Sequence, residues 1–133
     1  MSRLRAKVSE IAACEGVHIV KFICHDSAIS MMSLALGEAI MIGKVVSLLI
    51  NPTHVAISRE GYHDISYANQ LPATIESITH GTLLSTITLA IFDETLESII
   101  TQESAKRMGL KVGDKVVALI KASEVSIEKV YDV

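Results

Sequence analysis

Residues 99–127, IITQESAKRMGLKVGDKVVALIKASEVSI, contain the signals that decide the fold. The first polar segment predicts a short amphipathic helix from Gln102 to Met108. Gly109 follows it, as glycine commonly does where a helix ends. The next polar segment, KVGDK at 111–115, predicts a tight turn with a positive φ at its glycine.

Short apolar and β-branched runs make up most of the chain, and such runs are typical of buried strands. The predicted strands are about 3–13, 17–25, 27–35, 44–50 and 54–58 in the first half, and about 69–80, 83–92, 95–101, 115–121 and 124–129 in the second. Many short strands with few helices indicate small sheets or barrels. Five strands in each half is the count of an OB-like barrel.

The two halves of the chain also resemble each other in sequence. Residues 4–8 align with residues 71–75 at a spacing of 67. Ile29 aligns with Ile100 at a spacing of 71, and the same spacing without a gap sets Ile50 against Lys121. The difference between the two spacings indicates loops of unequal length, which homologous repeats tolerate.

We therefore predict two tandem repeats, residues 1–60 and residues 65–133, joined by the polar turn residues 59–66. Because the joint is short, we expect the repeats to pack together. The runs 29–35 and 45–50 are apolar on both faces, and strands of that kind need cover on both sides. This pattern predicts that another copy of the chain supplies the cover.

Composition excludes several classes of protein. The chain has 12 Lys and Arg against 15 Asp and Glu, a net charge of −3, and only 4% aromatic residues, which argues against a nucleic-acid groove. The longest apolar stretch, 29–42, is interrupted by serines, Gly37 and Glu38, so no membrane span is predicted. Without a secretory signal or a disulfide framework, a cytoplasmic location is expected.

Four motifs occur in order along the second half: ISYANQL at 65–71, ITxxS at 100–104, GLKVGD at 109–114 and ALIKAS at 118–123. Together they resemble the Mop/TOBE family of small β-barrel domains that bind molybdate or tungstate. The resemblance covers residues 65 to 129. It implies an all-β fold of two tandem OB-like five-stranded antiparallel barrels, with a short helix in the second. Stand-alone tandem members of the family are typically homotrimers.

The resemblance also implies an oxyanion site, which in the family lies between subunits. The candidate anion-binding residues are the motif positions Ser66, Tyr67, Asn69, Thr101, Ser104, Lys121, Ala122 and Ser123. A tetrahedral dianion needs hydroxyl and N–H donors together with a cation, and this set offers both. Thr101 and Ser104 also have a simpler interpretation, as an N-cap and a solvent-facing residue of the first helical turn.

Two departures from the family pattern leave an alternative open. The family usually has arginine where this chain has Ala68, so a bidentate oxyanion donor is missing. Ser30 and Ser33 align with the two hydroxyl residues of the helix start, but Ile50-Asn51-Pro52 replaces the KAS motif. The first repeat is therefore predicted to be mainly structural. The alternative function is a protein-interaction or regulatory module with a weakened oxyanion site.

Catalysis and metal binding are not predicted. Cys14, His18, Cys24 and His25 lack the paired spacing of a zinc site, and cysteine in an apolar strand is usually a small buried hydrophobe. No nucleophile elbow, phosphate-binding loop or zinc-hydrolase motif occurs, so no catalytic residue is proposed. The sequence predicts a protein that is not an enzyme and that binds molybdate or tungstate for storage, homeostasis or delivery.

Overall fold

The computed structural model describes residues 1–131, which form two antiparallel sheets with one short α-helix. The elements are β1 (Ser2–Cys14), β2 (Val17–Cys24), β3 (Ser27–Ser33), β4 (Val45–Ile50), the 3-10 turn η1 (Pro52–His54), β5 (Ala56–Ser58), β6 (Asn69–His80), β7 (Leu84–Ile91), β8 (Glu94–Thr101), α1 (Gln102–Met108), β9 (Lys115–Ile120), the 3-10 turn η2 (Ala122–Glu124) and β10 (Val125–Val130). The predicted fold class, all-β with a helix in the second half, is confirmed.

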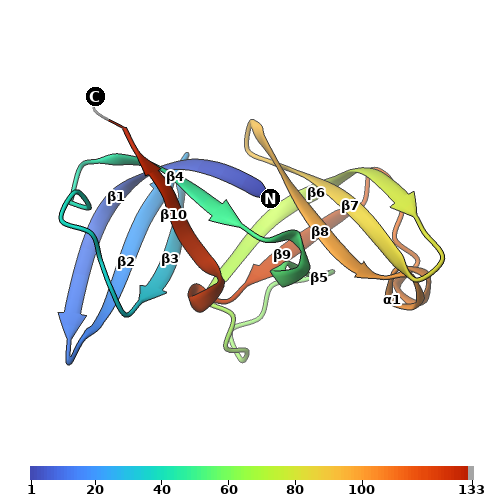
Figure 1. The fold of residues 1–133 in the computed structure, drawn as a ribbon. Helices are drawn as coiled ribbons and strands as arrows, with labels where there is room; N and C mark the ends of the chain where they lie inside the picture. The colour runs from blue at the N-terminus through green and yellow to red at the C-terminus, as the bar shows by residue number, and fades with distance from the viewer. Residues whose placement is uncertain (132–133) are drawn as a thin grey trace.

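The two sheets exchange their last strands. The first sheet has the order β10-β4-β1-β2-β3, and the second has the order β5-β9-β6-β7-β8. Strand β10 therefore pairs with β4 of the first half, while β5 pairs with β9 of the second. In Figure 1 the red β10 lies among the blue and cyan strands. Each half-barrel is thus completed by a strand from the other half of the sequence.

The hydrogen-bond registers define which residues of the two repeats are equivalent. The bulge in β1 after Val8 matches the bulge in β6 after Ile75, a spacing of 67 that holds through the third strand of each sheet. From the fourth strand onward the spacing is 70, because β4 begins at Val45 and β9 at Lys115. The loop between these strands is three residues longer in the second repeat.

This equivalence corrects the gapless alignment made from the sequence. Lys121 corresponds to Asn51, and Ile50 corresponds to Ile120. The spacing of 71 is wrong because the alignment placed no gap in the loop between the third and fourth strands, and this loop differs in length between the repeats. Ser30 and Ser33 consequently do not occupy the positions of the helix-start hydroxyls, which fall instead in the loop after β3.

The helix is bounded as its sequence predicts. Thr101 is extended, and its side chain accepts a hydrogen bond from the Ser104 N–H, which satisfies one free donor of the first turn. Gly109 ends the helix in the left-handed conformation at φ 62°, where glycine avoids the steric cost of a Cβ. Among residues 1–131, no helix is long and apolar enough to cross a membrane.

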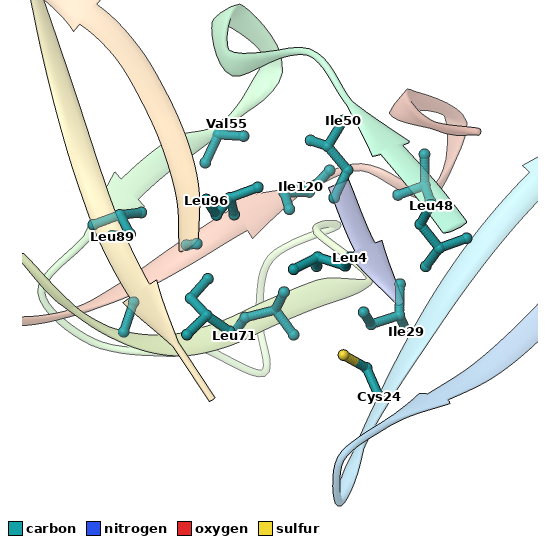
Figure 2. Packing of buried hydrophobic residues seen from close by; sticks show 14 of the residues in the cluster. Leu4, Cys24, Ile29, Leu48, Ile50, Val55, Leu71, Leu89, Leu96 and Ile120 are labelled. Atoms are coloured by element: carbon teal, nitrogen blue, oxygen red, sulfur yellow. The ribbon is translucent and has the colours of Figure 1, made fainter. Parts of the chain in front are cut away.

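One hydrophobic core runs through both sheets. Figure 2 shows Leu4 of β1, Ile50 of β4 and Ile120 of β9 together with Leu71 and Leu96 of the second sheet. All five are at most 2% exposed and belong to one cluster of buried residues. The core is continuous because the exchanged strands carry apolar side chains from each half of the sequence into the other sheet.

The apolar runs 29–35 and 45–50, both expected to need cover from another chain, differ in how far one chain buries them. In β4, Val46, Leu48 and Ile50 are buried within one chain, because β4 lies between β1 and β10. Strand β3 is an edge strand, and Met32 remains 43% exposed on it. Only the β3 run therefore leaves an open apolar face. The sequence repeats 1–60 and 65–133 stay a prediction, and the sheets draw strands from both ranges.

Candidate functional site

A cleft of about 310 Å³ lies where the chain crosses between the two sheets. The crossovers are η1, which leads from β4 to β5, and η2, which leads from β9 to β10. Polar side chains of Thr53, His54, Tyr67 and Lys121 line the cleft, and Ile100 of β8 closes one wall. The two crossover turns thus meet at one cleft, which has both polar and apolar walls.

The crossovers are joined by a polar side-chain contact between equivalent residues. His54 ends η1 and Glu124 ends η2, and the His54 Nδ1 lies 2.8 Å from the Glu124 Oε2. Because both residues occupy the same position of their repeats, this contact lies on the pseudo-two-fold axis that relates the sheets. Glu124 supplies the carboxylate of the cleft, and this carboxylate contacts the imidazole of His54.

Lys121 contributes the cation of the cleft. It precedes η2 as its N-cap, and its carbonyl accepts a hydrogen bond from the Glu124 N–H at 3.0 Å, but its side chain caps nothing. The equivalent Asn51 does cap η1, since its Oδ1 accepts from the Thr53 N–H at 3.0 Å. Among residues 1–131, the exposed Lys121 ammonium forms no ion pair. Its charge therefore faces solvent in the cleft.

The hydroxyl residues at the helix start, Thr101 and Ser104, come directly after the cleft wall in the sequence. Ile99 and Ile100 line the cleft, and Thr101 is the next residue of β8. The Thr101 hydroxyl donates to the Ser104 Oγ at 2.8 Å, which confirms a local capping role for the pair. Arg107 also donates to the Ser104 Oγ at 3.2 Å. This guanidinium at the helix start was missed from the sequence, although Ser104 and Arg107 are neighbours on a helix at i and i+3.

The upstream motif has two kinds of residue. Ser66 and Ala68 are exposed, and Tyr67 is half-buried against the cleft. Asn69 is buried, and its amide binds the backbone of Ser30 on β3, accepting from the N–H at 2.7 Å and donating to the carbonyl at 2.9 Å. Both ends of the Asn69 amide are thus occupied in joining the two sheets.

The remaining two candidates diverge from Lys121. Ala122 is half-buried inside η2. Ser123 is exposed and lines a separate groove of about 570 Å³, together with Met32, Leu34 and Ile127. Within one chain, the structure brings Tyr67 and Lys121 into one cleft and sets Thr101 beside it. It does not bring Ser123 into that cleft.

The known protein family that matches this chain corresponds to its second half. The TOBE domain model matches residues 65–127. Residues 65–127 form a TOBE domain. The resemblance of the second half to the TOBE family is confirmed, and all eight candidate residues lie inside the matched range.

The solved structures extend the likeness to both halves. The chain superposes on the cytoplasmic molybdate-binding protein ModG, in a form with molybdate bound, with a TM-score of 0.85, 24% identity, and coverage of 94% of this chain and 93% of that one. A molybdate-binding protein from Sporomusa ovata is 38% identical over 50% of this chain and 98% of that one, with a TM-score of 0.48. No curated protein matches by sequence. The tandem fold is therefore shared over nearly the whole chain.

Proposed function

We propose that this protein binds molybdate or tungstate through its TOBE domain, as a binding protein for storage, homeostasis or delivery and without catalysis. The observation that carries the proposal is the Lys121 ammonium, held without an ion-pair partner among residues 1–131 in a cleft of the matched domain. The bound ligand of the structurally similar ModG supports the choice of anion.

Physical chemistry gives a role to the cleft lysine and to the candidate hydroxyls. A doubly charged tetrahedral oxyanion gains most from a charge-assisted hydrogen bond, which the Lys121 ammonium supplies. Hydroxyls and backbone N–H groups supply directional donors, and Ser66, Thr101 and Ser104 carry such hydroxyls. The Arg107 guanidinium, which donates to the Ser104 Oγ, adds positive charge beside the helix-start hydroxyls. Glu124 opposes an anion, and its pairing with His54 reduces that opposition.

The donors do not all converge within one chain, and this supports a site shared between copies. Ser123 faces the groove beside β3, while Lys121 faces the crossover cleft. The groove wall contains exposed apolar side chains, including Leu34 at 79% exposed, and a second copy that covers it would bring its own donors to Ser123. We propose a homotrimer on this basis, located in the cytoplasm.

Isothermal calorimetry with molybdate and with tungstate tests the proposed site. The change Lys121→Met should weaken anion binding about tenfold to a hundredfold, because it removes a charge-assisted hydrogen bond of about 1.5–3 kcal/mol. Lys115→Met is the matched control, since Lys115 is an exposed lysine at the other end of the same strand. Equal affinities for the Lys121→Met variant and the parent chain would show that Lys121 is not a ligand.

The same protein distinguishes the alternative function. If the chain is an interaction module with a weakened site, neither anion will give a binding heat, and Ala68→Arg should restore one. Native mass spectrometry with each anion measures the stoichiometry and the number of chains together. A monomer that binds the anion fully would exclude a site shared between copies.

A further inference from the structure

A second cluster of ligating side chains lies away from the TOBE site, at the hairpin turns of the two sheets. Cys24 ends β2, His25 follows it, and Glu94 begins β8, so two hairpins distant in sequence meet here. One sulfur, one imidazole nitrogen and one carboxylate oxygen from these residues all lie within 4.8 Å of one another. Sequence spacing does not reveal the cluster because the third residue comes from the other half of the chain.

The distances suit one metal ion bound by all three side chains. The Glu94 Oε2 lies 3.7 Å from the Cys24 Sγ and 3.8 Å from the His25 Nε2. In a tetrahedral zinc site with Zn–S of about 2.3 Å and Zn–N and Zn–O of about 2.0–2.2 Å, ligand atoms are about 3.3–3.6 Å apart. The two distances to Glu94 need to shorten by a few tenths of an ångström, and the Cys24 sulfur and His25 nitrogen, which lie within 4.8 Å of each other, approach further as side-chain rotation brings them to the ion.

The surrounding residues hold two of these groups in place. The His25 ring stacks on Phe92 with a centroid distance of 5.1 Å and an interplanar angle of 25°. His25 and Phe92 are equivalent residues of the two hairpin turns, and both have positive φ, at 54° and 57°. The other oxygen of Glu94 accepts a hydrogen bond from the Arg5 N–H at 3.2 Å. Such contacts to the far side of a ligand orient it toward a metal.

Several charged or titratable groups lie beside the cluster. Cys24 is fully buried, and desolvation together with the Glu94 carboxylate raises the pKa of its thiol to about 12. A metal ion would therefore displace the thiol proton to solvent as the Cys24 sulfur–metal bond forms. Lys7 and Asp93 line the adjacent cleft with opposite charges. The Arg5 guanidinium turns away and stacks on the Tyr131 ring, 4.3 Å from its centroid.

We propose that Cys24, His25 and Glu94 form a site for a divalent ion of zinc type, with water as the fourth ligand. A thiolate, an imidazole and a carboxylate are the donors that Zn²⁺ accepts, and an open fourth position is compatible with the solvent-exposed side of His25. The site is independent of the proposed oxyanion function because it lies at the hairpin turns and shares no residue with the crossover cleft.

The test uses the full-length reduced protein with Zn²⁺ and with Co²⁺ as a spectroscopic probe. The parent chain should bind one equivalent of Zn²⁺, and its Co²⁺ form should show a thiolate-to-cobalt charge-transfer band and tetrahedral ligand-field bands. Cys14→Ser should leave both unchanged, because Cys14 is the other cysteine of the chain and is exposed. Cys24→Ser should abolish the charge-transfer band.

A second variant keeps the test decisive if Cys24→Ser does not fold. His25→Phe reproduces the residue found at the equivalent turn, so the ring stack and the backbone conformation are retained. It should melt like the parent chain and bind Zn²⁺ more than about 100-fold more weakly, since even outer contacts of a ligand are worth about 10–100-fold. A folded His25→Phe protein with parental zinc affinity, or a parent chain with no charge-transfer band, would overturn the proposal.

Discussion

The two repeats have the same strands but different segments between the third and fourth strand. In the first repeat, residues 34–43 are irregular, with two turns and no helix. In the second, residues 101–113 contain a helix capped by Thr101 and ended by Gly109. The first four strands of each repeat are otherwise equivalent, including the bulges of β1 and β6. The exchanged strands differ, because β10 has six residues and a bulge and β5 has three residues. The framework is fixed by the buried pattern of the strands, whereas a loop on the surface is free to acquire new side chains.

The outer faces of the second strand of each repeat also differ. Ile19 and Ile23 are exposed on β2 of the first sheet, while their equivalents Thr86 and Ala90 are half-buried on β7. The outer face of β2 is therefore more apolar than that of β7, and the second repeat carries the helix and the lysine. Under the proposed function, association would use the first repeat and anion binding the second.

The largest expected effect tests the equivalence of the two cores. Ile50→Ala and Ile120→Ala each remove a side chain that is at most 1% exposed, at matching positions of β4 and β9. Each should lower the free energy of unfolding by about 2–5 kcal/mol, because the cavity left behind adds to the lost burial. Urea denaturation measures both. A large difference between the two variants would show that the cores are not equivalent.

A smaller effect should separate the repeats at their divergent segment. Thr101→Ala removes the helix N-cap and should cost about 1 kcal/mol of stability. Leu34→Ala changes the equivalent residue of the first repeat, which caps nothing and is highly exposed within one chain, so in protein diluted until the copies separate the change should stay within about 0.5 kcal/mol. Thermal denaturation of the two variants compares them directly. Equal losses would contradict the capping role of Thr101.

The smallest expected effect depends on pH. The hydrogen bond from Arg59 and that from the Lys111 N–H lower the pKa of Asp114, which occupies the position of Lys44 in the first repeat. A lowered carboxyl pKa stabilises the fold above the unfolded pKa, and the contribution is lost as pH falls through the folded value. Asp114→Asn should therefore lower the melting temperature at pH 7, and the difference from the parent chain should shrink below about pH 4.

The strands and the helix could be predicted from sequence because each depends on local signals. The alternation of β-branched residues and the cap and stop of α1 are encoded within a few residues of one another. The exchange of β5 and β10 could not be predicted in this way. Strand β10 could pair with β9 of its own half or with β4 of the other half, and β5 has the same choice. Either pairing leaves the buried side chains on the same face of the strand, so hydrophobic periodicity alone does not distinguish them.

The candidate site was only partly predictable for a related reason. A motif reports which residue types are present, and it does not report whether their polar atoms are already occupied. Asn69 matches the family motif, yet its amide is bound to the backbone of Ser30. Arg107 belongs to no motif that was noted, yet its guanidinium reaches Ser104. Contacts between residues far apart in the chain decide both cases.

The pairing of β10 with β4 has a consequence for how the protein is made. Val125 pairs with Ile50, so the first sheet is incomplete until a strand that is translated 75 residues later has been made. Contacts of such long sequence separation slow folding, since a long segment of chain must be closed before they form. On the ribosome, the edge of β4 stays unpaired until almost the whole polypeptide has emerged, so the first repeat reaches its final structure only when synthesis of the second is complete.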